Sequence, residues 1–176
     1  MDFITIMYYI SRCDTNSNRK FLRRTKMITH FDGKYEFLSN FFYSPFVYDD
    51  VIYPTNEHFF QAMKTLSQEE RRQIAEAKTP GVAKHMGRRV QLREDWEEVK
   101  EDVMHLGVEL KFRAHQGLAE RLINTGDEEL VEGTLWHDNE WGNCTCPKCQ
   151  NIPGKNKLGK ILMERRDILK KEKGLS

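Results

Sequence analysis

YPTNEHFFQAMK, residues 53–64, is the stretch that decides how the first half of the chain folds. Pro54 cannot sit deep inside a helix, and Thr55 or Asn56 after it can cap the free backbone N–H groups of a helix start. Good helix-forming residues follow. The pattern therefore predicts a helix whose first turn contains Glu57.

The polar residues of this helix share one face. At about 100° per residue, Glu57, Gln61 and Lys64 fall within a narrow arc, with Phe60 beside them. Most charged positions on helices are exposed to solvent, so an acid and a base on one stripe do not by themselves indicate chemistry. Two interpretations stay open at this point: a functional face, or a solvated stripe opposite a core face formed by Phe59, Met63 and Leu66.

The composition is that of one folded domain without an overall basic field. The chain has 176 residues, long enough to bury roughly 70% of its unfolded surface without disulfides or metal. Its 28 Lys and Arg residues against 27 Asp and Glu residues leave a net charge of +1. Bulk electrostatics therefore cannot hold nucleic acid, and any such role would depend on a local site.

Cysteine usage and hydropathy indicate the compartment. Three of the four cysteines crowd into CTCPKC, residues 144–149, and the fourth is Cys13, which differs from the dispersed framework of a small secreted domain. The N-terminal run FITIMYYI, residues 3–10, is too short to span a bilayer and lacks the features of a signal peptide. We therefore expect a soluble, cytoplasmic protein with no membrane association.

The order of elements predicts an α+β fold, a mostly helical single domain with a small β-sheet. We expect residues 1–26 to be a poorly ordered extension that can be deleted without loss of thermal stability, 27–170 to form the domain, and 171–176 to form a C-terminal tail. Turn residues divide residues 27–55 into two or three short strands. Capping and periodicity predict further helices at 67–78, 79–87, 94–115, 118–126 and 156–171, and a strand at 129–136.

A second group of polar residues lies in LVEGTLWHD, residues 130–138. Alternation along a strand places Glu132, Thr134, Trp136 and Asp138 on one side. The same pattern also fits an amphipathic strand whose polar side faces water. Two carboxylates and an indole on one face make this stretch a candidate part of a site.

The long loop before the last helix is a candidate phosphate site. Long structured loops are often functional, and glycines such as Gly142, Gly154 and Gly159 punctuate this one. A helix beginning near 155–158 could direct backbone N–H groups toward a phosphate. By itself this signal is weak.

CTCPKC has the C-x-C-x2-C spacing of a zinc knuckle, and His137 could act as a fourth ligand. A closed structural zinc site needs four ligands, and no second cysteine pair follows. We therefore favour free thiols in a loop, and we expect no metal and no cofactor. The remaining histidines show no mutual ligand spacing and are interpreted as structural or surface residues.

Six blocks of the sequence occur in the order seen in one known family. They are FLSNFFYSPFVYDDVIYPTNEHFFQAMK (37–64), DW (95–96), KF (111–112), LINTGDEELVE (122–132), WG (141–142) and GKNKLGKILMERR (154–166). From about Met27 to Arg166 the chain resembles the NADAR (YbiA-like) family. The resemblance implies the fold of that family and a link to NAD and ADP-ribose metabolism. It also implies an N-glycosidase acting on riboflavin-pathway ribosylamino-pyrimidine phosphates or on ADP-ribosylated guanine bases.

The resemblance gives the acid and base of the opening stretch a role. Cleavage of an N-glycosidic bond passes through an oxocarbenium-like ribose, which a carboxylate near the anomeric carbon can stabilise, or whose attacking water it can activate. Glu57 fits that role. Lys64 can protonate the leaving base or form a Schiff base with the opened sugar. Gln61 lies between them and can bind a ribose hydroxyl.

The other expected site residues share aromatic, polar or backbone features suited to a nucleotide. Asp138 is the third catalytic candidate. Binding of the base, ribose or phosphate is expected from Asn40, Phe41, Phe42, Tyr43, Trp96, Glu132, Trp136, Trp141, Gly142, Asn156 and Gly159.

Two other functions stay open from the sequence. The first is a non-catalytic module that binds ADP-ribose or NAD, which would need aromatic rings and phosphate donors but no paired acid and base. The second is a zinc-containing interaction module built on the cysteine segment. Residues 141–154 depart from the usual family pattern because they carry the cysteines, so the identity of the substrate, a small nucleotide or an ADP-ribosylated nucleic-acid base, is not determined by the resemblance.

Overall fold

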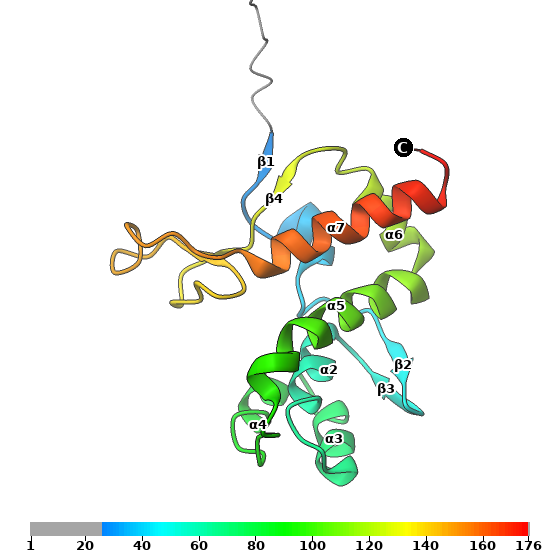
Figure 1. The fold of residues 1–176 in the computed structure, drawn as a ribbon, viewed down its shortest axis with the longest axis vertical. Coiled ribbons are helices and arrows are strands. Elements are labelled where there is room, and N and C mark those ends of the chain that lie inside the picture. The colour runs from blue at the N-terminus through cyan, green and yellow to red at the C-terminus, as the bar shows by residue number, and fades with distance from the viewer. Residues whose placement is uncertain (1–25, 176) are drawn as a thin grey trace, which may run out of the picture.

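A computed structural model describes residues 26–175, which form the predicted α+β fold (Figure 1). The expected extension at residues 1–26 lies almost entirely outside the described residues. Helical elements span Gly33–Leu38 (η1, a 3-10 helix), Asn56–Ala62 (α2), Gln68–Ala75 (α3), Pro80–Met86 (α4), Trp96–Ala114 (α5), Gln116–Ile123 (α6) and Lys157–Glu172 (α7). Strands span Met27–Ile28 (β1), Phe46–Tyr48 (β2), Val51–Tyr53 (β3), Glu129–Leu130 (β4), Gly133–Thr134 (β5) and Asn143–Cys144 (β6).

The strands form three separate two-stranded ladders. The β2–β3 pair is an antiparallel hairpin, whereas β1–β4 and β5–β6 are parallel. The predicted continuous strand at 129–136 is interrupted, because β4 pairs with β1 and β5 then changes partner to β6. Glu132 lies at this change of partner, and its carbonyl accepts a hydrogen bond from the backbone N–H of Asn143.

The predicted helix starts are confirmed by their caps. The side chains of Thr55, Ser67 and Thr79 accept hydrogen bonds from backbone N–H groups in the first turns of α2, α3 and α4. Pro80 opens α4, where a missing N–H group costs nothing. Local sequence chemistry therefore determines where these helices begin.

Helix α2 lies at the centre of the molecule, where it contacts α3, α4 and α5. Each of its seven residues is buried. Phe59 is fully buried, and the rings of Phe46, Tyr48 and Tyr53 pack edge-on against it at centroid distances of 5.3–5.5 Å. Because every residue of the helix is buried, its polar face lies inside the protein, and the solvated-stripe interpretation of Glu57 and Gln61 is wrong.

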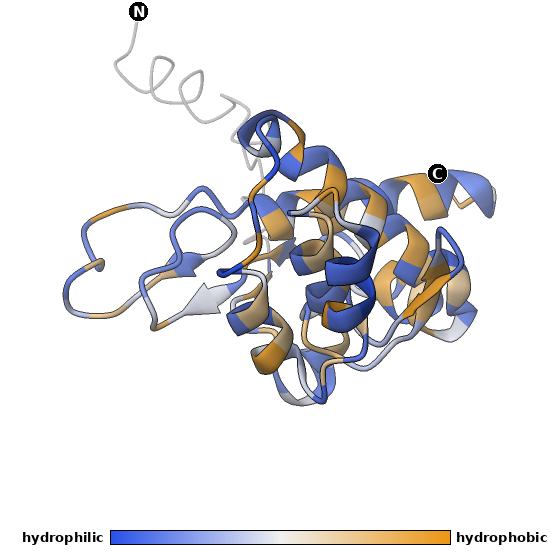
Figure 2. Ribbon diagram, turned by 90° about the horizontal axis from the view of Figure 1, so that it is seen from below, coloured by the Kyte–Doolittle hydropathy of each residue, from blue (hydrophilic) through white to orange (hydrophobic). Residues whose placement is uncertain are grey.

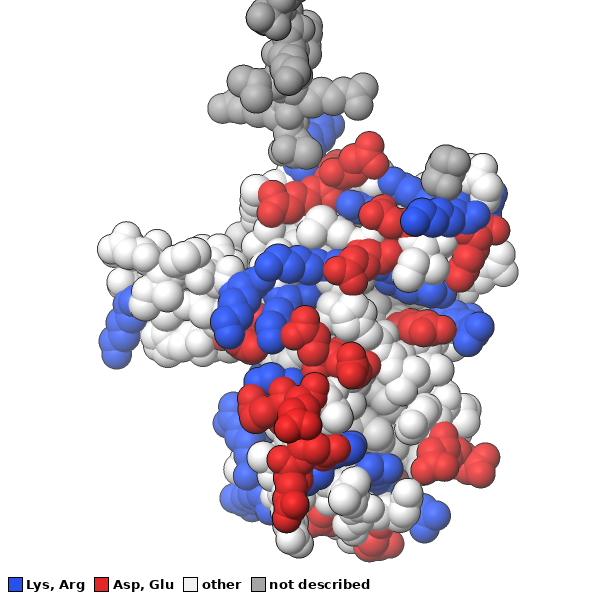
Figure 3. Space-filling model, in the orientation of Figure 1, with Lys and Arg blue, Asp and Glu red and all other residues white. Residues whose placement is uncertain are grey.

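The loops joining β5 to α7 extend away from the helical body (Figure 1). Figure 2 shows this projection as mostly hydrophilic, in contrast to the hydrophobic segments of the body. On the face seen in Figure 3, acidic and basic side chains are interspersed, in keeping with the net charge of +1. Among the described residues, no helix has the length and hydrophobicity needed to cross a membrane.

Candidate functional site

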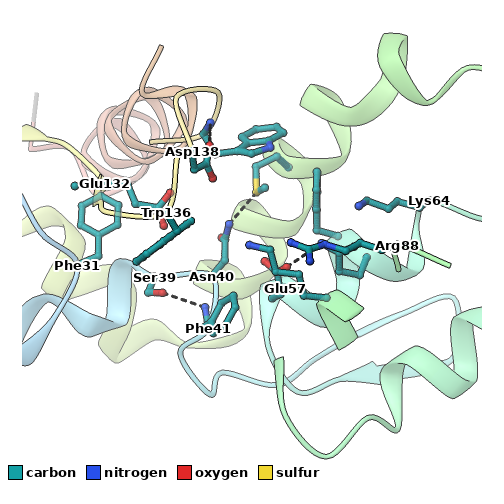
Figure 4. Close-up of a pocket in the computed structure, with 16 residues that line it drawn as sticks. Phe31, Ser39, Asn40, Phe41, Glu57, Lys64, Arg88, Glu132, Trp136 and Asp138 are labelled. Atoms are coloured by element: carbon teal, nitrogen blue, oxygen red, sulfur yellow. Dashed lines mark hydrogen bonds between the residues drawn. The ribbon is translucent and has the colours of Figure 1, made fainter. Parts of the chain in front are cut away.

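A cavity of about 740 Å³ opens among α2, α4 and the segment that follows β4 (Figure 4). This volume lies within the range of about 300–1,000 Å³ typical of small-molecule sites. The lining combines acids, cations, aromatic rings and a few neutral residues: Glu57, Glu132 and Asp138; Lys64, Lys84 and Arg88; Phe31, Phe41, Phe60, Trp136 and Trp141; Ser39, Asn40, Gln61, Met104 and Gly133.

Glu57 is the central acid of the cavity. Its side chain is 5% exposed and accepts a 2.8 Å hydrogen bond from Nε2 of Gln61. Burial raises the pKa of Glu57, and the charge of Asp138 raises it further, whereas Lys84, Gln61 and Lys64 oppose the shift. The carboxyl group is therefore held in a water-poor position where its charge responds to the groups across the cavity.

Lys64 lines the same cavity from just beyond the end of α2. Its ammonium nitrogen lies 5.9 Å from the ring centroids of both Phe60 and Trp96. Burial lowers the pKa of Lys64, the cations of Lys84 and Arg88 lower it further, and Glu57 raises it. A lowered pKa increases the fraction of neutral amine, which is the nucleophilic form.

Gln61 is held in place by a glycine on the neighbouring helix. A Cβ atom at Gly87, the residue that ends α4, would lie 2.1 Å from Oε1 and 2.8 Å from Cβ of Gln61. The close approach leaves Nε2 bonded to Glu57, while Oε1 has no hydrogen-bond partner among the described residues. Gln61 thus holds the acid with one end of its amide and leaves an acceptor for another group.

Glu132 and Asp138 form the acidic wall opposite the cations. Burial raises the pKa of Glu132 to about 7, and the charges of Asp138 and Glu57 contribute to this rise. Asp138 accepts hydrogen bonds through Oδ1 from the backbone N–H groups of Glu140 and Trp141, at 3.1 and 2.9 Å. The two carboxyl groups therefore differ, because Asp138 is tied to its own turn whereas burial favours the protonated form of Glu132.

The cations Lys84 and Arg88 are site residues that the sequence analysis missed. They lie on and just after α4, and their spacing of four residues in KHMGRR was the available signal. Lys84 lies 5.7 Å from the ring centroid of Phe41. Figure 4 shows Lys64 and Arg88 on one side of the cavity and Glu132 and Trp136 on the other.

Exposed aromatic rings line the outer part of the cavity. Phe41 is 45% exposed and Trp136 is 63% exposed, so the faces of both rings are accessible to a ligand. Trp141 packs edge-on against Phe60 at 5.2 Å between centroids and so connects the cavity to the core. Phe31 and Phe60 complete the aromatic lining.

Asn40 lines the cavity and belongs to a buried amide network. Its Oδ1 accepts a 2.8 Å hydrogen bond from Nδ2 of Asn56, and its Nδ2 lies 3.5 Å from the sulfur of Met104. The preceding residue, Ser39, accepts a 2.9 Å hydrogen bond from the fully buried Lys111 through its carbonyl oxygen. Burial lowers the pKa of Lys111 to about 7.

Six of the predicted binding residues do not line the cavity. Tyr43 is 71% exposed, Phe42 lies 5.7 Å from the ammonium of Lys111, and Trp96 is buried behind Lys64 and Phe60. The others are Gly142, Asn156 and Gly159.

These last three residues join the Glu132 segment to α7. The side chain of Asn156 donates to the carbonyl of Leu130 at 2.8 Å and accepts from the N–H of Glu132 at 3.1 Å. A Cβ at Gly142 would lie 2.4 Å from the carbonyl oxygen of Glu132, and one at Gly159 would lie 2.1 Å from that of Leu130. All three therefore place Glu132 in the cavity wall without lining the cavity.

A separate cluster that could hold a metal ion lies beside the acidic wall. One nitrogen of His137 and the sulfur atoms of Cys144, Cys146 and Cys149 all lie within 4.8 Å of one another. His137 immediately precedes the cavity residue Asp138. The fold thus brings to the cysteines the histidine that could act as a fourth ligand.

The chain resembles known N-glycosidases in both sequence and structure. It is 42% identical over 137 residues to the protein named N-glycosidase YbiA of Escherichia coli (strain K12), covering 77% of this chain and 82% of that protein. The NMR structure of the E. coli protein YbiA matches with a TM-score of 0.70 and 36% identity, covering 88% of this chain and 94% of that one.

Other relatives extend the comparison. N-glycosidase Npun_R5314 of Nostoc punctiforme is 38% identical over 126 residues, 69% of this chain and 77% of that protein. Riboflavin biosynthesis protein VVA0006 of Vibrio vulnificus is 31% identical over 144 residues, which are 78% of this chain but 36% of that protein. The NADAR domain family model matches residues 21–170. The chain therefore belongs to the NADAR domain family.

Proposed function

We propose that this N-glycosidase hydrolyses the bond between C1′ of a phosphorylated ribose and the nitrogen of its base. The observation that carries the proposal is the meeting of Glu57 and Lys64 in one cavity, each with its pKa shifted by burial toward the neutral form. Shifted acids and bases that share a cleft are a mark of catalytic sites. A module that only binds a nucleotide needs no such pair.

We place the ribose against α2. The free Oε1 of Gln61 can accept a hydrogen bond from a ribose hydroxyl while Nε2 holds Glu57. A carboxylate in this water-poor position stabilises positive charge that develops at C1′. Glu57 thus acts on the sugar, and the orientation of its carboxylate depends on Gln61.

The phosphate is assigned to the cationic side of the cavity. Lys84 and Arg88 line it there, and Arg can bind two phosphate oxygens at once. The base then lies toward the exposed rings of Phe41 and Trp136, which offer planar surfaces for stacking. This assignment replaces the loop around Asn156 as the expected phosphate site, because that side chain is already bonded to backbone groups.

Lys64 is proposed as the nucleophile. Its neutral amine attacks C1′, the bond from C1′ to the base nitrogen breaks, and the electron pair leaves with the base, which takes a proton. Glu132, with its pKa of about 7, can donate that proton. The bond from C1′ to the ring oxygen then breaks, and one proton of the attached amine moves to that oxygen, which gives a protonated Schiff base on Lys64. Water hydrolyses the Schiff base, which releases the ribose phosphate and restores the amine.

The substrate class follows from this division of the cavity. A ribosylamino-pyrimidine phosphate presents one phosphate, one ribose and one planar base, and the relative in Vibrio vulnificus is named a riboflavin biosynthesis protein. We therefore propose this substrate first. An ADP-ribosylated guanine base would use the same ribose position and the same cations.

A panel of N-glycosides tests the proposal. The full chain is incubated with ribosylamino-pyrimidine phosphates, with their dephosphorylated forms and with ADP-ribosylated guanine, and free base is measured by mass spectrometry. We expect release of base from a phosphorylated substrate, with a lower KM than for its dephosphorylated form. Tight binding of ADP-ribose or NAD without release of base from any substrate would overturn the proposal in favour of a binding module.

The covalent step has its own test. Borohydride added during turnover should reduce the Schiff base and add the mass of the sugar phosphate to the peptide that contains Lys64. Lys78, which is exposed near the start of α4, provides the matched control, since Lys78→Ala should leave trapping unchanged. Turnover without trapping would reject the nucleophile and leave Lys64 as the general acid.

A further inference from the structure

We propose that His137, Cys144, Cys146 and Cys149 bind one structural Zn²⁺ ion. Their ligand atoms lie within 4.8 Å of one another, and each residue supplies one atom. Three thiolates and one imidazole match the Cys₃His set of closed zinc sites. With all four positions taken by protein, the ion has no open position for substrate and serves the fold rather than the reaction.

The contacts of the histidine support a shared ion rather than hydrogen bonds. Nδ1 of His137 lies 3.2 Å from the sulfur of Cys149 and 3.3 Å from that of Cys146. Bond lengths of about 2.3 Å to sulfur and 2.0–2.1 Å to nitrogen place N···S edges of a zinc tetrahedron at roughly 3.6 Å. One ring nitrogen cannot make two good hydrogen bonds to two sulfurs, but all the atoms can donate lone pairs to a cation between them.

The backbone is shaped for this cluster. His137 has a φ of 66°, in the left-handed region that non-glycine residues rarely adopt, and its N–H lies 3.3 Å from the sulfur of Cys144. The N–H of Cys149 donates to the carbonyl of Cys146 at 2.9 Å, which closes the tight turn of the C-x2-C segment. The histidine is thus brought to the cysteines by a conformation that would be costly without a compensating interaction.

Apart from the pairing of β6 with β5, the surrounding loop has few buried side chains to hold it. Within residues 143–153 the three cysteines are the only buried residues, and Ile152 is 55% exposed. Three small side chains cannot supply the burial that normally orders such a segment. A bound ion would supply the missing free energy, because metal binding contributes directly to folding.

The position of the cluster gives the ion a role in the cavity. His137 lies between Trp136 and Asp138, which both line the cavity. Ordering of His137 by zinc therefore orders one wall of the cavity. This role is one of positioning, since no ligand of the cluster lines the cavity.

Metal analysis tests the inference without reference to activity. The full chain is purified with a reducing agent and without chelators, supplied with excess zinc, desalted and measured by mass spectrometry of the elements. We expect about one zinc per chain. Cys149→Ser and His137→Ala should each lose most of it, whereas Lys148→Ala, an exposed change between two ligands, and Cys13→Ser should keep it.

Cobalt substitution of the unaltered chain covers the case in which a variant fails to fold. Co²⁺ in place of zinc should give the intense visible absorption of a tetrahedral thiolate site, and added zinc should abolish it. Chelation should raise hydrogen exchange in residues 143–153 while the helical circular dichroism persists. Absence of both zinc and the cobalt spectrum in the reduced chain would overturn the inference, as would full zinc content in both ligand variants.

Discussion

Helix α2 and the loop at residues 143–153 hold their functional groups by opposite means. Every residue of α2 is buried, and Glu57 and Gln61 are positioned because the surrounding helices leave them no other place. In the loop, burial is confined to three cysteines that form a cluster apart from the main core. Residues of α2 line the cavity, whereas the loop lies beside it and positions one of its walls.

The difference shows what fixes the positions of the side chains around the cavity. A hydrophobic core orders nearby polar groups without further help, since close packing permits few alternative arrangements. A projecting loop lacks that constraint and needs a cross-link such as a metal ion. We therefore expect changes in α2 and around it to damage chemistry, and changes in the loop to act by altering the position or charge of one wall.

The largest expected effect is on Glu57 in α2 and on Lys64 just beyond the end of that helix. Glu57→Gln keeps the shape and removes the charge, so turnover should fall by ~100-fold or more, and Lys64→Ala should cost at least as much. Single-turnover kinetics on a phosphorylated ribosyl substrate measures this loss.

Unfolding midpoints and a control variant separate chemistry from stability. Glu76→Gln, an exposed change at the end of α3, should keep full activity. Full activity of both Glu57→Gln and Lys64→Ala at unchanged stability would reject the pair as catalytic groups.

A smaller effect is expected from the glycine that faces Gln61. In Gly87→Ala the new methyl group would overlap Gln61, so the hydrogen bond that orients Glu57 should be disturbed, with about a 10-fold loss in kcat/KM and a destabilisation of about 1–3 kcal/mol. Gly81→Ala is the matched control on the same helix, because its Cβ would meet only Oγ1 of Thr79 at 3.8 Å. Equal kinetics of the two variants would contradict the proposed role of Gln61.

The next prediction concerns Asp138 in the acidic wall and the pH dependence of activity. Asp138 raises the pKa of both Glu132 and Glu57, so Asp138→Asn, which keeps the oxygen that binds the turn, should lower both pKa values. If Glu132 donates a proton, activity falls as pH rises through its pKa, and the alkaline limb of kcat/KM should move to lower pH. The loss at pH 8 should be about 10-fold or less. An alkaline limb that does not move would exclude Glu132 as the donor.

The smallest expected effect on catalysis comes from replacing Lys111. That change should instead alter how the free energy of unfolding depends on pH. The pKa of Lys111 is about 7 in the folded state against an ordinary value of 10.5, so the unfolded state binds more protons between these pH values, and stability should rise with pH there. In Lys111→Met this rise should shrink by about 1–3 kcal/mol, measured by urea unfolding at pH 7 and pH 10. A steeper pH dependence in the variant would contradict the assignment.

Much of the fold and part of the site could be predicted from local sequence. The starts of α2, α3 and α4 each depend on a side chain that accepts a hydrogen bond from the N–H group three residues later. Such short-range interactions can be predicted from the sequence. The shared arc of Glu57 and Gln61 likewise follows from helical geometry, whereas Lys64 reaches the same cavity from just beyond the end of α2. Blocks of sequence such as 37–64 carried the family resemblance.

What the tertiary structure decided is which of these groups meet. Whether the polar arc of α2 faces solvent or a cavity depends on helices distant in sequence that enclose it. The addition of Lys84 and Arg88 to that cavity and the placement of His137 beside the cysteines likewise depend on packing and on backbone turns. Helical period and capping depend on residues a few positions apart, so a short stretch of sequence determines them. Contacts between distant segments depend instead on the packing of the whole core.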